Sequence, residues 1–339
     1  MISPEIVNYS EHYEAQHVDF ATKMWPHKIR RRVPEYIRWK FKAADSGEVD
    51  NFFLAIDQGM VVGQVGLVHE LFKIGDDLYN TYWIVDFKIH PERSGEEIAP
   101  RLFKKAIEGK DIVMVNDPDE DGLNLMKKIG FREIEGPKKM LFPINFHKVL
   151  AMKLSARKRF IIPLLSFFVE PFYYLQTFKI QSYKPKKVEQ VNWKTLVPDI
   201  QILQKDLELP HSVHNEDFLN WRCSTFKDFN KEPKAIKTEN GSFAIYIQTS
   251  NSLYVYEWFA HDKQDTLELY SYMLKEAKLL GLTTISTVSN FHHQEHNLKY
   301  LGFIAMRKTL STQLYYPPDH RLSKYPKFYY TLYDADENI

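Results

Sequence analysis

The sequence repeats itself, and this repeat constrains the possible folds more than any other feature. Three segments of the first half recur in the same order in the second half. The pairs are PEYIRWKF (34–41) with NEDFLNWRC (215–223), VDFKIHPE (85–92) with YEWFAHDK (256–263), and KKIGF (127–131) with KYLGF (299–303). The alignment places Trp39 over Trp221 and His90 over His261. Because repeated landmarks in one order indicate repeated structure, we expect one fold to occur twice.

Each half is predicted to form the same series of elements. The series is a helix, a short helix with the tryptophan, a β-hairpin, a further strand, a helix, a strand, a helix and a closing strand. The dipeptides Gln58-Gly59 and Asn240-Gly241 lie between apolar segments and are typical of hairpin turns. A strand, a helix and a strand after a hairpin predict an α/β fold (α+β by some schemes), with a mixed, mostly antiparallel sheet flanked by helices.

The length of 339 residues favours two domains. We expect an N-terminal domain at 1–145, a helical, apolar and basic connector at 146–185, and a C-terminal domain at 186–339. Trp39 and Trp221 are expected to anchor the two cores.

Composition excludes several classes of protein. The net charge is +1, and basic residues with interleaved aromatics do not form a stripe, so we expect no nucleic-acid partner. A single cysteine, Cys223, allows no intrachain disulfide and fits a reducing compartment. The polar, acidic start MISPEIVNYSEHYEA is unlike a signal or transit peptide. The expected location is the cytoplasm.

The longest apolar run is FIIPLLSFFVEPFYYL (160–175), which follows five basic residues. These are Lys148, Lys153, Arg157, Lys158 and Arg159. The run contains two prolines and a glutamate and is too short to span a bilayer, so no transmembrane segment is predicted. We favour a connector helix packed between the domains with its basic residues in water. The alternative is a helix within 148–175 that lies on an acidic membrane surface.

The order of elements, together with the run WIVDFKIHP (83–91) and the ending KIGF (128–131), resembles the GNAT superfamily of N-acyltransferases. The resemblance covers each half almost end to end, so the chain resembles a tandem GNAT protein. It implies acyl transfer from acetyl-CoA or another acyl-CoA to an amine. In this family the strand holding VDFKIHP diverges from the next strand, pantetheine pairs with its backbone, and the pyrophosphate sits at the start of the following helix.

This resemblance assigns a set of candidate CoA-binding residues in the first half. They are Phe87, Ile89, Ser94, Gly95, Ile98, Ala99 and Asn116. Free N–H groups and the helix dipole favour an anion at such a helix start. The turn nevertheless departs from the family pattern, because Ser94 stands where glutamine or arginine is usual and Glu97 replaces a glycine. The matching turn HDKQDTLELY (261–270) has no glycine, so CoA is not expected there.

The same resemblance makes Asp86 the candidate general base, since many family members carry an acid on this strand. An alternative is that Asp86 faces solvent or pairs locally. The family's usual proton donor is a tyrosine, but its positions hold Met126 and Leu298, which cannot donate a proton.

Three further motifs have simpler interpretations. His292 and His296 in HHQEH have a metal-ligand spacing, but a polar helix start is favoured and no metal is expected. HSVHNED (211–217) is predicted to be a capping loop, with Asn215 or Asp217 as the cap. Arg30, Arg31 and Arg32 are predicted to lie in a solvated loop rather than to bind the CoA 3′-phosphate or an acidic substrate.

The favoured function is an acyl-CoA-dependent N-acyltransferase, most simply an acetyltransferase. Its acceptor would be a small-molecule or peptide amine, such as an amino sugar or a peptide. One alternative is a non-catalytic GNAT-fold protein that binds a ligand or supports assembly, which the altered turn and the absent tyrosines favour. Another is an aminoacyl-tRNA-dependent transferase of the peptidoglycan-bridge type, which the near-neutral charge disfavours.

Overall fold

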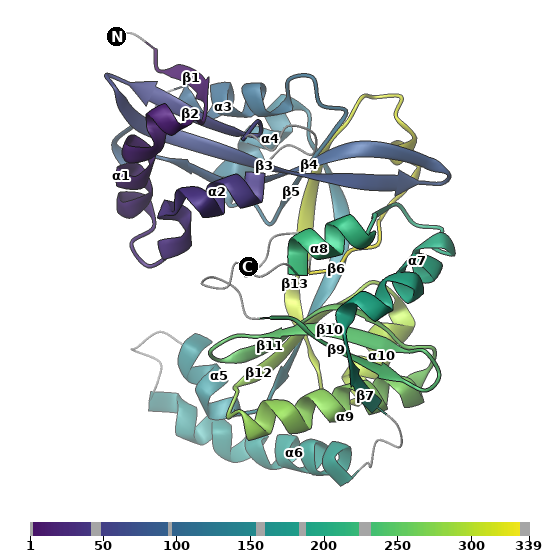
Figure 1. The fold of residues 1–339 in the computed structure, drawn as a ribbon. Helices are drawn as coiled ribbons and strands as arrows, with labels where there is room; N and C mark the ends of the chain where they lie inside the picture. Colours follow the sequence, from purple (N-terminus) through teal and green to yellow (C-terminus); the bar gives the residue numbers. More distant parts are fainter. Residues whose placement is uncertain are drawn as a thin grey trace. The chain divides into compact units, whose positions relative to one another are not determined.

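The structure is a computed structural model that describes residues 3–41, 49–93, 97–153, 160–182, 188–223 and 232–332 (Figure 1). The chain forms two compact units, and neither is one continuous stretch of sequence. Unit 1 comprises Met1–Glu135, Glu208–Val213 and Ser311–Phe328. Unit 2 comprises Gly136–Leu207, His214–Leu310 and Tyr329–Ile339.

Unit 1 is a mixed sheet flanked by four α-helices among its described residues. Its strands are β1 (Glu5–Asn8), β2 (Phe52–Asp57), β3 (Met60–Ile74), β4 (Asp77–Ile89), β5 (Ile112–Asn116), the end of β13 (Ile304–Tyr315) and the short β8 (His211–Ser212). Its helices are α1 (Glu14–Met24), α2 (Pro34–Phe41), α3 (Ile98–Ile107) and α4 (Glu120–Ile129). The strand order is β1-β2-β3-β4-β5-β13, and β8 pairs with β3. Of these described strand pairs β4–β5 is parallel and the others are antiparallel.

The core of unit 1 is built from apolar residues of the sheet and of α3 and α4. Leu102 and Phe103 of α3 and Met126 of α4 are buried together with Val65 and Val113 of the strands. On α2, the Phe41 ring stacks on Phe52 with centroids 4.7 Å apart.

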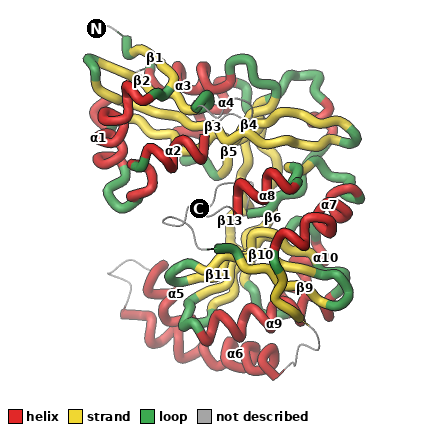
Figure 2. Tube along the Cα trace, in the orientation of Figure 1, coloured by secondary structure: helices red, strands yellow, loops and turns green. Residues whose placement is uncertain are grey.

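Unit 2 has the same plan with additional helices. Its strands run in the order β6 (Arg132–Pro143), β12 (Thr284–Ser289), β11 (Ser252–Phe259), β10 (Phe243–Gln248), β9 (Lys234–Thr238) and β7 (Val188–Val191). Its helices, drawn in red in Figure 2, are α5 (Phe146–Lys153), α6 (Ile162–Ser182), α7 (Val197–Lys205), α8 (Glu216–Cys223), α9 (Lys263–Leu279) and α10 (His292–Tyr300). The β11–β12 pair is parallel, as β4–β5 is in unit 1.

The predicted fold class is confirmed, since mostly antiparallel sheet is flanked by helices in both units. Both hairpins form at the predicted turns, where Gln58, Gly59 and Gly241 adopt positive φ values. The segment predicted as a connector, 146–185, carries α5 and α6 and belongs to unit 2.

The closing strands pair in a way that the repeat does not indicate. In unit 2, residues 138–143 of β6 pair antiparallel with β12. In unit 1, Thr312–Tyr315 of β13 pair antiparallel with β5. The closing strand of the first half, β6, therefore pairs next to the parallel strands β11 and β12 of the second half. The closing strand of the second half, β13, pairs next to β4 and β5 of the first.

The repeated Gly-Phe endings are helix C-caps. Gly130 after α4 and Gly302 after α10 both have φ near +100°, at 103° and 95°. The next N–H in each case, that of Phe131 or Phe303, donates to a carbonyl five residues back, as in a Schellman motif. Both phenylalanines are buried in their cores.

The prediction that Trp39 and Trp221 anchor the cores is wrong. Both are only partly buried, whereas the basic residue after each, Lys40 or Arg222, is buried. The repeated Trp-basic pair therefore conserves a buried cation rather than a buried indole.

Candidate functional site

The two parallel strands of unit 1 separate partway along their length. Thr81–Trp83 of β4 pair with Ile112–Met114 of β5, and that register ends there. β4 continues to Ile89, whereas the end of β5 pairs with β13 through Val115 and Asn116. The second half of β4 thus has an edge that β5 does not cover.

Phe87 and Ile89, two predicted CoA-binding residues, present their backbone groups to this uncovered edge. The His90 N–H donates to the Val62 carbonyl of β3 at 2.9 Å, so the backbone groups of His90 point to β3. Adjacent residues of a strand present their groups to opposite sides, and Ile89 and Phe87 therefore point away from β3. The Phe87 ring packs on Phe103 of α3, with centroids 4.7 Å apart.

Helix α3 begins where the resemblance places the pyrophosphate. Its first residues are Ile98 and Ala99, and the Glu97 side chain before them makes no capping hydrogen bond. The carboxylate of Glu97 is exposed. Pro100 has no N–H, which removes one of the free donors of the first turn. Ser94 and Gly95, also predicted to bind CoA, lie outside the described residues.

A cavity of about 290 Å³ lies at the end of β4 in unit 1. It is lined by residues of α1, of the β2–β3 hairpin and of the turn after β4. Its lining combines the apolar side chains of Phe20, Met60, Val61 and Val62 with charged groups of both signs from Asp19, Lys23, Glu92 and Arg93.

Asp86 lies at a β-bulge, which is a local kink in β4. Gln64 pairs with Lys88 and Gly66 with Val85, so Val65 of β3 faces two residues of β4. Asp86 has a φ of 51°, a left-handed conformation that aspartate and asparagine tolerate better than most residues. A bulge of this kind bends a strand, which is consistent with the separation of β4 from β5.

The Asp86 carboxylate is buried between two cations. Lys40 Nζ of α2 lies 2.7 Å from Oδ2, and Arg31 Nη2 lies 2.5 Å from Oδ1. The Gln64 side-chain N–H donates to the Asp86 backbone carbonyl at 3.1 Å. The Gln64 side-chain oxygen lies 3.1 Å from His17 Nε2. We call these five residues the Asp86 cluster.

These partners determine how the Asp86 cluster titrates. Burial alone would raise the pKa of Asp86, but the Lys40 ammonium and the Arg31 guanidinium hold it below its ordinary value. Burial lowers the pKa of His17 to about 4, against the opposing effects of Gln64 and Asp86. At neutral pH the carboxylate is therefore ionised and the imidazole neutral. A carboxylate with a lowered pKa is a weak base, so the predicted general-base role has a competitor: holding the bulge in place.

The prediction that Arg30–Arg32 form a solvated loop is wrong for two of the three residues. Arg31 pairs with Asp86, and its guanidinium lies 4.4 Å from the centre of the Trp25 ring. Arg32 donates to the carbonyls of Trp25 and Pro26. The sequence does not show that Asp86 of β4 is buried beside Arg31. A basic residue paired with a buried acid need not face water.

The remaining predicted site residues have partners within unit 1. The Asn116 amide oxygen accepts a hydrogen bond from the Thr312 hydroxyl of β13 at 2.7 Å. Met126, at the position of the family's tyrosine, is 2% exposed inside the core. Its counterpart Leu298 is equally enclosed in the core of unit 2.

In unit 2 the corresponding features are occupied by the protein itself. β11 and β12 pair only through Ser252–Tyr254 and then separate. The Trp258 indole donates to the Val288 carbonyl of β12 at 3.0 Å, bridging the separated strands. At the start of α9, the Asp262 carboxylate caps the helix by accepting from the Asp265 N–H at 2.8 Å.

The chain near its C-terminus also reaches the separated strands of unit 2. Asn290, which follows β12, accepts from the Tyr330 N–H at 2.8 Å and donates to the Tyr330 carbonyl at 2.7 Å. The Leu332 N–H donates to the Tyr256 carbonyl of β11 at 3.2 Å. Tyr330 and Leu332 are fully buried, so this segment fills the space beside both strands.

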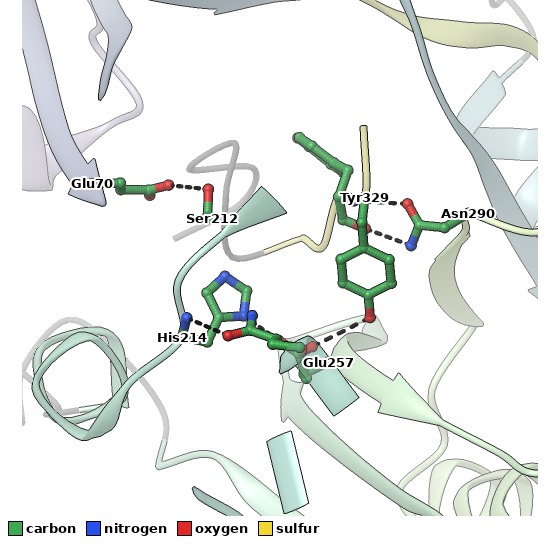
Figure 3. A network of polar contacts seen from close by, with 8 residues as sticks. Glu70, Ser212, His214, Glu257, Asn290 and Tyr329 are labelled. Carbon is green, nitrogen blue, oxygen red and sulfur yellow. Dashed lines mark hydrogen bonds and ion pairs between the residues drawn. The ribbon is translucent and has the colours of Figure 1, made fainter. Parts of the chain in front are cut away.

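Unit 2 has its own buried acid at the matching bulge. The repeat places Glu257 over Asp86, and the strand irregularity lies beside it, at Tyr256. Figure 3 shows His214 and Tyr329 approaching this carboxylate, with His214 Nδ1 at 2.6 Å and the Tyr329 hydroxyl at 3.4 Å. Figure 3 also draws a bond of unit 1, in which the Ser212 hydroxyl donates to buried Glu70 at 2.8 Å.

The motifs HSVHNED and HHQEH both lie in unit 2 or at its boundary. Asn215 caps α8 by accepting from the Phe218 N–H at 2.9 Å, as predicted for HSVHNED, but the buried role of His214 in the same motif was missed. In HHQEH, Glu295 bonds to Lys138 and Lys299, at 2.8 and 2.6 Å. The sequence repeat aligns Glu257 with Asp86 and so marks Glu257 as a second acid on a strand. A search for its partner could have identified His214.

No protein-family model matches the sequence, and no curated protein matches it either. Solved structures do match. A GCN5-related N-acetyltransferase from Kribbella flavida has a TM-score of 0.60 at 13% identity, over 91% of this chain and 70% of its own. One from Anabaena variabilis has a TM-score of 0.59 at 11% identity, over 91% and 72%. A protein from Pyrococcus horikoshii has a TM-score of 0.57 at 11% identity, over 94% and 90%. The chain therefore has the fold of the GCN5-related N-acetyltransferases.

Proposed function

We propose that the chain is an acyl-CoA-dependent N-acyltransferase that binds CoA in unit 1. The observation that carries this proposal is the contrast between the two units. Among the described residues of unit 1, β5 does not cover the second half of β4, and the Glu97 side chain does not cap α3, so backbone groups of both elements are available. In unit 2 the indole of Trp258, the carboxylate of Asp262 and the segment around Tyr330 take the same places.

The chemistry of these groups suits the two parts of CoA. Pantetheine is an extended chain with amide groups, and it can pair with the backbone of Phe87 and Ile89 as an added strand would. The N–H groups of Glu97, Ile98 and Ala99 and the helix dipole favour the pyrophosphate. The Glu97 carboxylate opposes the same anion, so we expect binding of moderate strength.

The reaction itself needs no covalent enzyme intermediate. The lone pair of the acceptor amine attacks the thioester carbonyl, the C–S bond breaks, and the amine's proton must pass to a base while the thiolate gains one. We propose Asp86 as the candidate base, because it lies in the part of β4 that β5 does not cover. An Asp86→Asn variant that binds CoA and keeps full turnover would refute that role and leave Asp86 as a positioning residue.

Calorimetric titration with acetyl-CoA and longer acyl-CoAs tests the binding site. Ala99→Asp puts a carboxylate in the first turn of α3 and should weaken binding at least about tenfold. The matched control is Gln264→Asp, at the second position of α9 in unit 2, which should leave binding unchanged. Glu97→Gln should tighten binding, whereas Glu108→Gln, at the far end of α3, should not. Failure of every acyl-CoA to bind would overturn the proposal.

A non-catalytic, ligand-binding role is the second candidate, and one observation favours it. Met126 and Leu298 have no proton to give and are enclosed in their cores, so neither position offers a proton donor to a leaving thiolate. Under this alternative acetyl-CoA binds, but no CoA thiol is released with any amine offered. Thiol release that depends on an added amine would exclude it.

A further inference from the structure

Helix α6 of unit 2 exposes an apolar face that the described residues do not cover. Its outward side chains are among the most exposed apolar groups of the chain, with Phe167 at 74% and Phe168 at 69%. We define the α6 outer face as Leu164, Phe167, Phe168, Phe172, Leu175 and Phe178. These residues recur at intervals of one, three or four, so they share one side of the helix. In Figure 1, α6 is the long teal helix at the foot of unit 2.

The opposite side of α6, which faces the protein, is the less apolar one. Ser166 and Thr177 are buried there together with Ile162, Tyr173 and Ile180. The Tyr173 ring stacks on Phe146 of α5, and the Ile180 carbonyl accepts from the Ser271 hydroxyl of α9. A surface helix normally turns its apolar side inward, and α6 reverses that pattern. A contiguous exposed apolar face of this kind marks an interaction site.

The charge of the surrounding sequence indicates what the face binds. Residues 146–187 contain nine Lys or Arg and a single acid, Glu170. The whole chain has 45 basic and 44 acidic residues, so the remainder has 36 basic and 43 acidic. A net charge of +8 is thus confined to the segment that contains α6, while the rest of the chain carries −7. Basic residues lie on both sides of α6 in the sequence, and of the described ones Lys148 of α5 is exposed.

We propose that the α6 outer face binds an anionic lipid surface, with the helix lying in the plane of the interface. Apolar side chains of α6 would enter the acyl boundary, and the net positive charge of the segment favours lipid phosphates. Pro171 lies inside α6, which is continuous from Ile162 to Ser182. None of the described helices is long and apolar enough to cross a bilayer. A second copy is the less suitable occupant, because it would bring two segments of +8 together.

Vesicle co-sedimentation of the full chain tests the proposal. The protein should bind vesicles of phosphatidylcholine mixed with phosphatidylglycerol, bind pure phosphatidylcholine much less, and lose affinity as salt is added. Phe167→Ser/Phe168→Ser should lower the partition coefficient at least about tenfold, because both rings are exposed and their loss removes apolar area from the bound state. The control Leu78→Ser/Ile202→Ser changes two residues of similar exposure, 60% and 63%, and should bind as the wild type does.

A second set of variants tests the charge. Arg157→Gln/Lys158→Gln/Arg159→Gln removes three of the cations that precede α6; these residues lie outside the described ones, so the choice rests on the sequence. It should weaken binding to anionic vesicles about a hundredfold. Lys104→Gln/Lys127→Gln/Lys128→Gln removes the same charge from α3 and α4 and should lower affinity only slightly.

Three results would overturn the proposal. One is no sedimentation with anionic vesicles at low salt. Another is equal binding to charged and uncharged vesicles. The third is a dimer in analytical ultracentrifugation that Phe167→Ser/Phe168→Ser dissociates, since that would assign the face to a second copy of the chain.

Discussion

Replacing Lys40 by methionine should destabilise unit 1 through the Asp86 cluster. Lys40 Nζ and Asp86 Oδ2 are 2.7 Å apart, and both side chains are 2% exposed. Methionine keeps the unbranched apolar stem of lysine but is one atom shorter and lacks the ammonium, which lies 5.7 Å from the centre of the Tyr36 ring and 5.3 Å from that of Phe41. The substitution therefore removes chiefly the positive charge.

The size of the effect follows from burial. Removing one partner of a buried ion pair costs about 3–5 kcal/mol, because the other charge is left without compensation. Arg31 still contacts Asp86 Oδ1 in the variant, so we expect the lower end, about 3 kcal/mol. Asp86→Asn keeps the shape and the tolerance for a positive φ. The double variant Lys40→Met/Asp86→Asn should lose less than the sum of the single losses, by about 2 kcal/mol.

The measurement is urea unfolding followed by tryptophan fluorescence, with hydrogen exchange to assign transitions to unit 1 if more than one occurs. Because the pKa of Asp86 is lowered in the folded state, its ionisation stabilises the fold above its unfolded pKa. That contribution is lost as the pH falls through the lower, folded pKa. The difference between the wild type and Lys40→Met should therefore be full at neutral pH and shrink below about pH 4. Additive single losses, or a difference that grows at acidic pH, would refute the reasoning.

Two further predictions concern the same unit. His17 is buried and its pKa is lowered from 6.5 to about 4, so the unfolded chain binds a proton at this residue before the folded chain does as the pH falls. Between those pH values the free energy of unfolding should fall by about 3 kcal/mol more for the wild type than for His17→Gln, whereas His12→Gln, at an exposed histidine, should follow the wild type. Parallel curves for His17→Gln and the wild type would contradict this. Gly66→Ala should lower the free energy of unfolding by about 2 kcal/mol in urea titration, because its Cβ would lie 2.3 Å from the buried Phe41 ring; an unchanged midpoint would show that this ring can move.

Most of the fold could be predicted because its signals are local. The turns at Gln58-Gly59 and Asn240-Gly241 require positive φ values, and Gly130 and Gly302 end their helices for the same reason. The repeat then supplied the order of elements. It could not supply the destination of the closing strands, because β6 and β13 each follow the same local pattern and their pairing is decided by long-range contacts.

The candidate site was less predictable, since it depends on which side chains meet. Asp86 stood out because of its strand, but its partners Lys40 and Arg31 come from elements far away in the sequence. Charged residues are usually exposed, so a sequence argument assigns them to solvent unless an acid is known to face them. The tryptophans misled for a related reason: their neighbours Lys40 and Arg222 are the buried members of each pair.

The two units differ in what contacts their separated parallel strands and the helix that follows. Separated parallel strands and a helix start leave backbone groups that need partners. In unit 2 the chain provides them, with the carboxylate of Asp262 at the start of α9 and the Tyr330–Leu332 segment beside β11 and β12. A carboxylate and an extended backbone offer the same kinds of contact as a pyrophosphate and a pantetheine arm. If acyl-CoA binds unit 1 as we propose, binding should raise the stability of unit 1 while leaving hydrogen exchange in β11 and β12 of unit 2 unchanged, because the chain itself takes the corresponding places there.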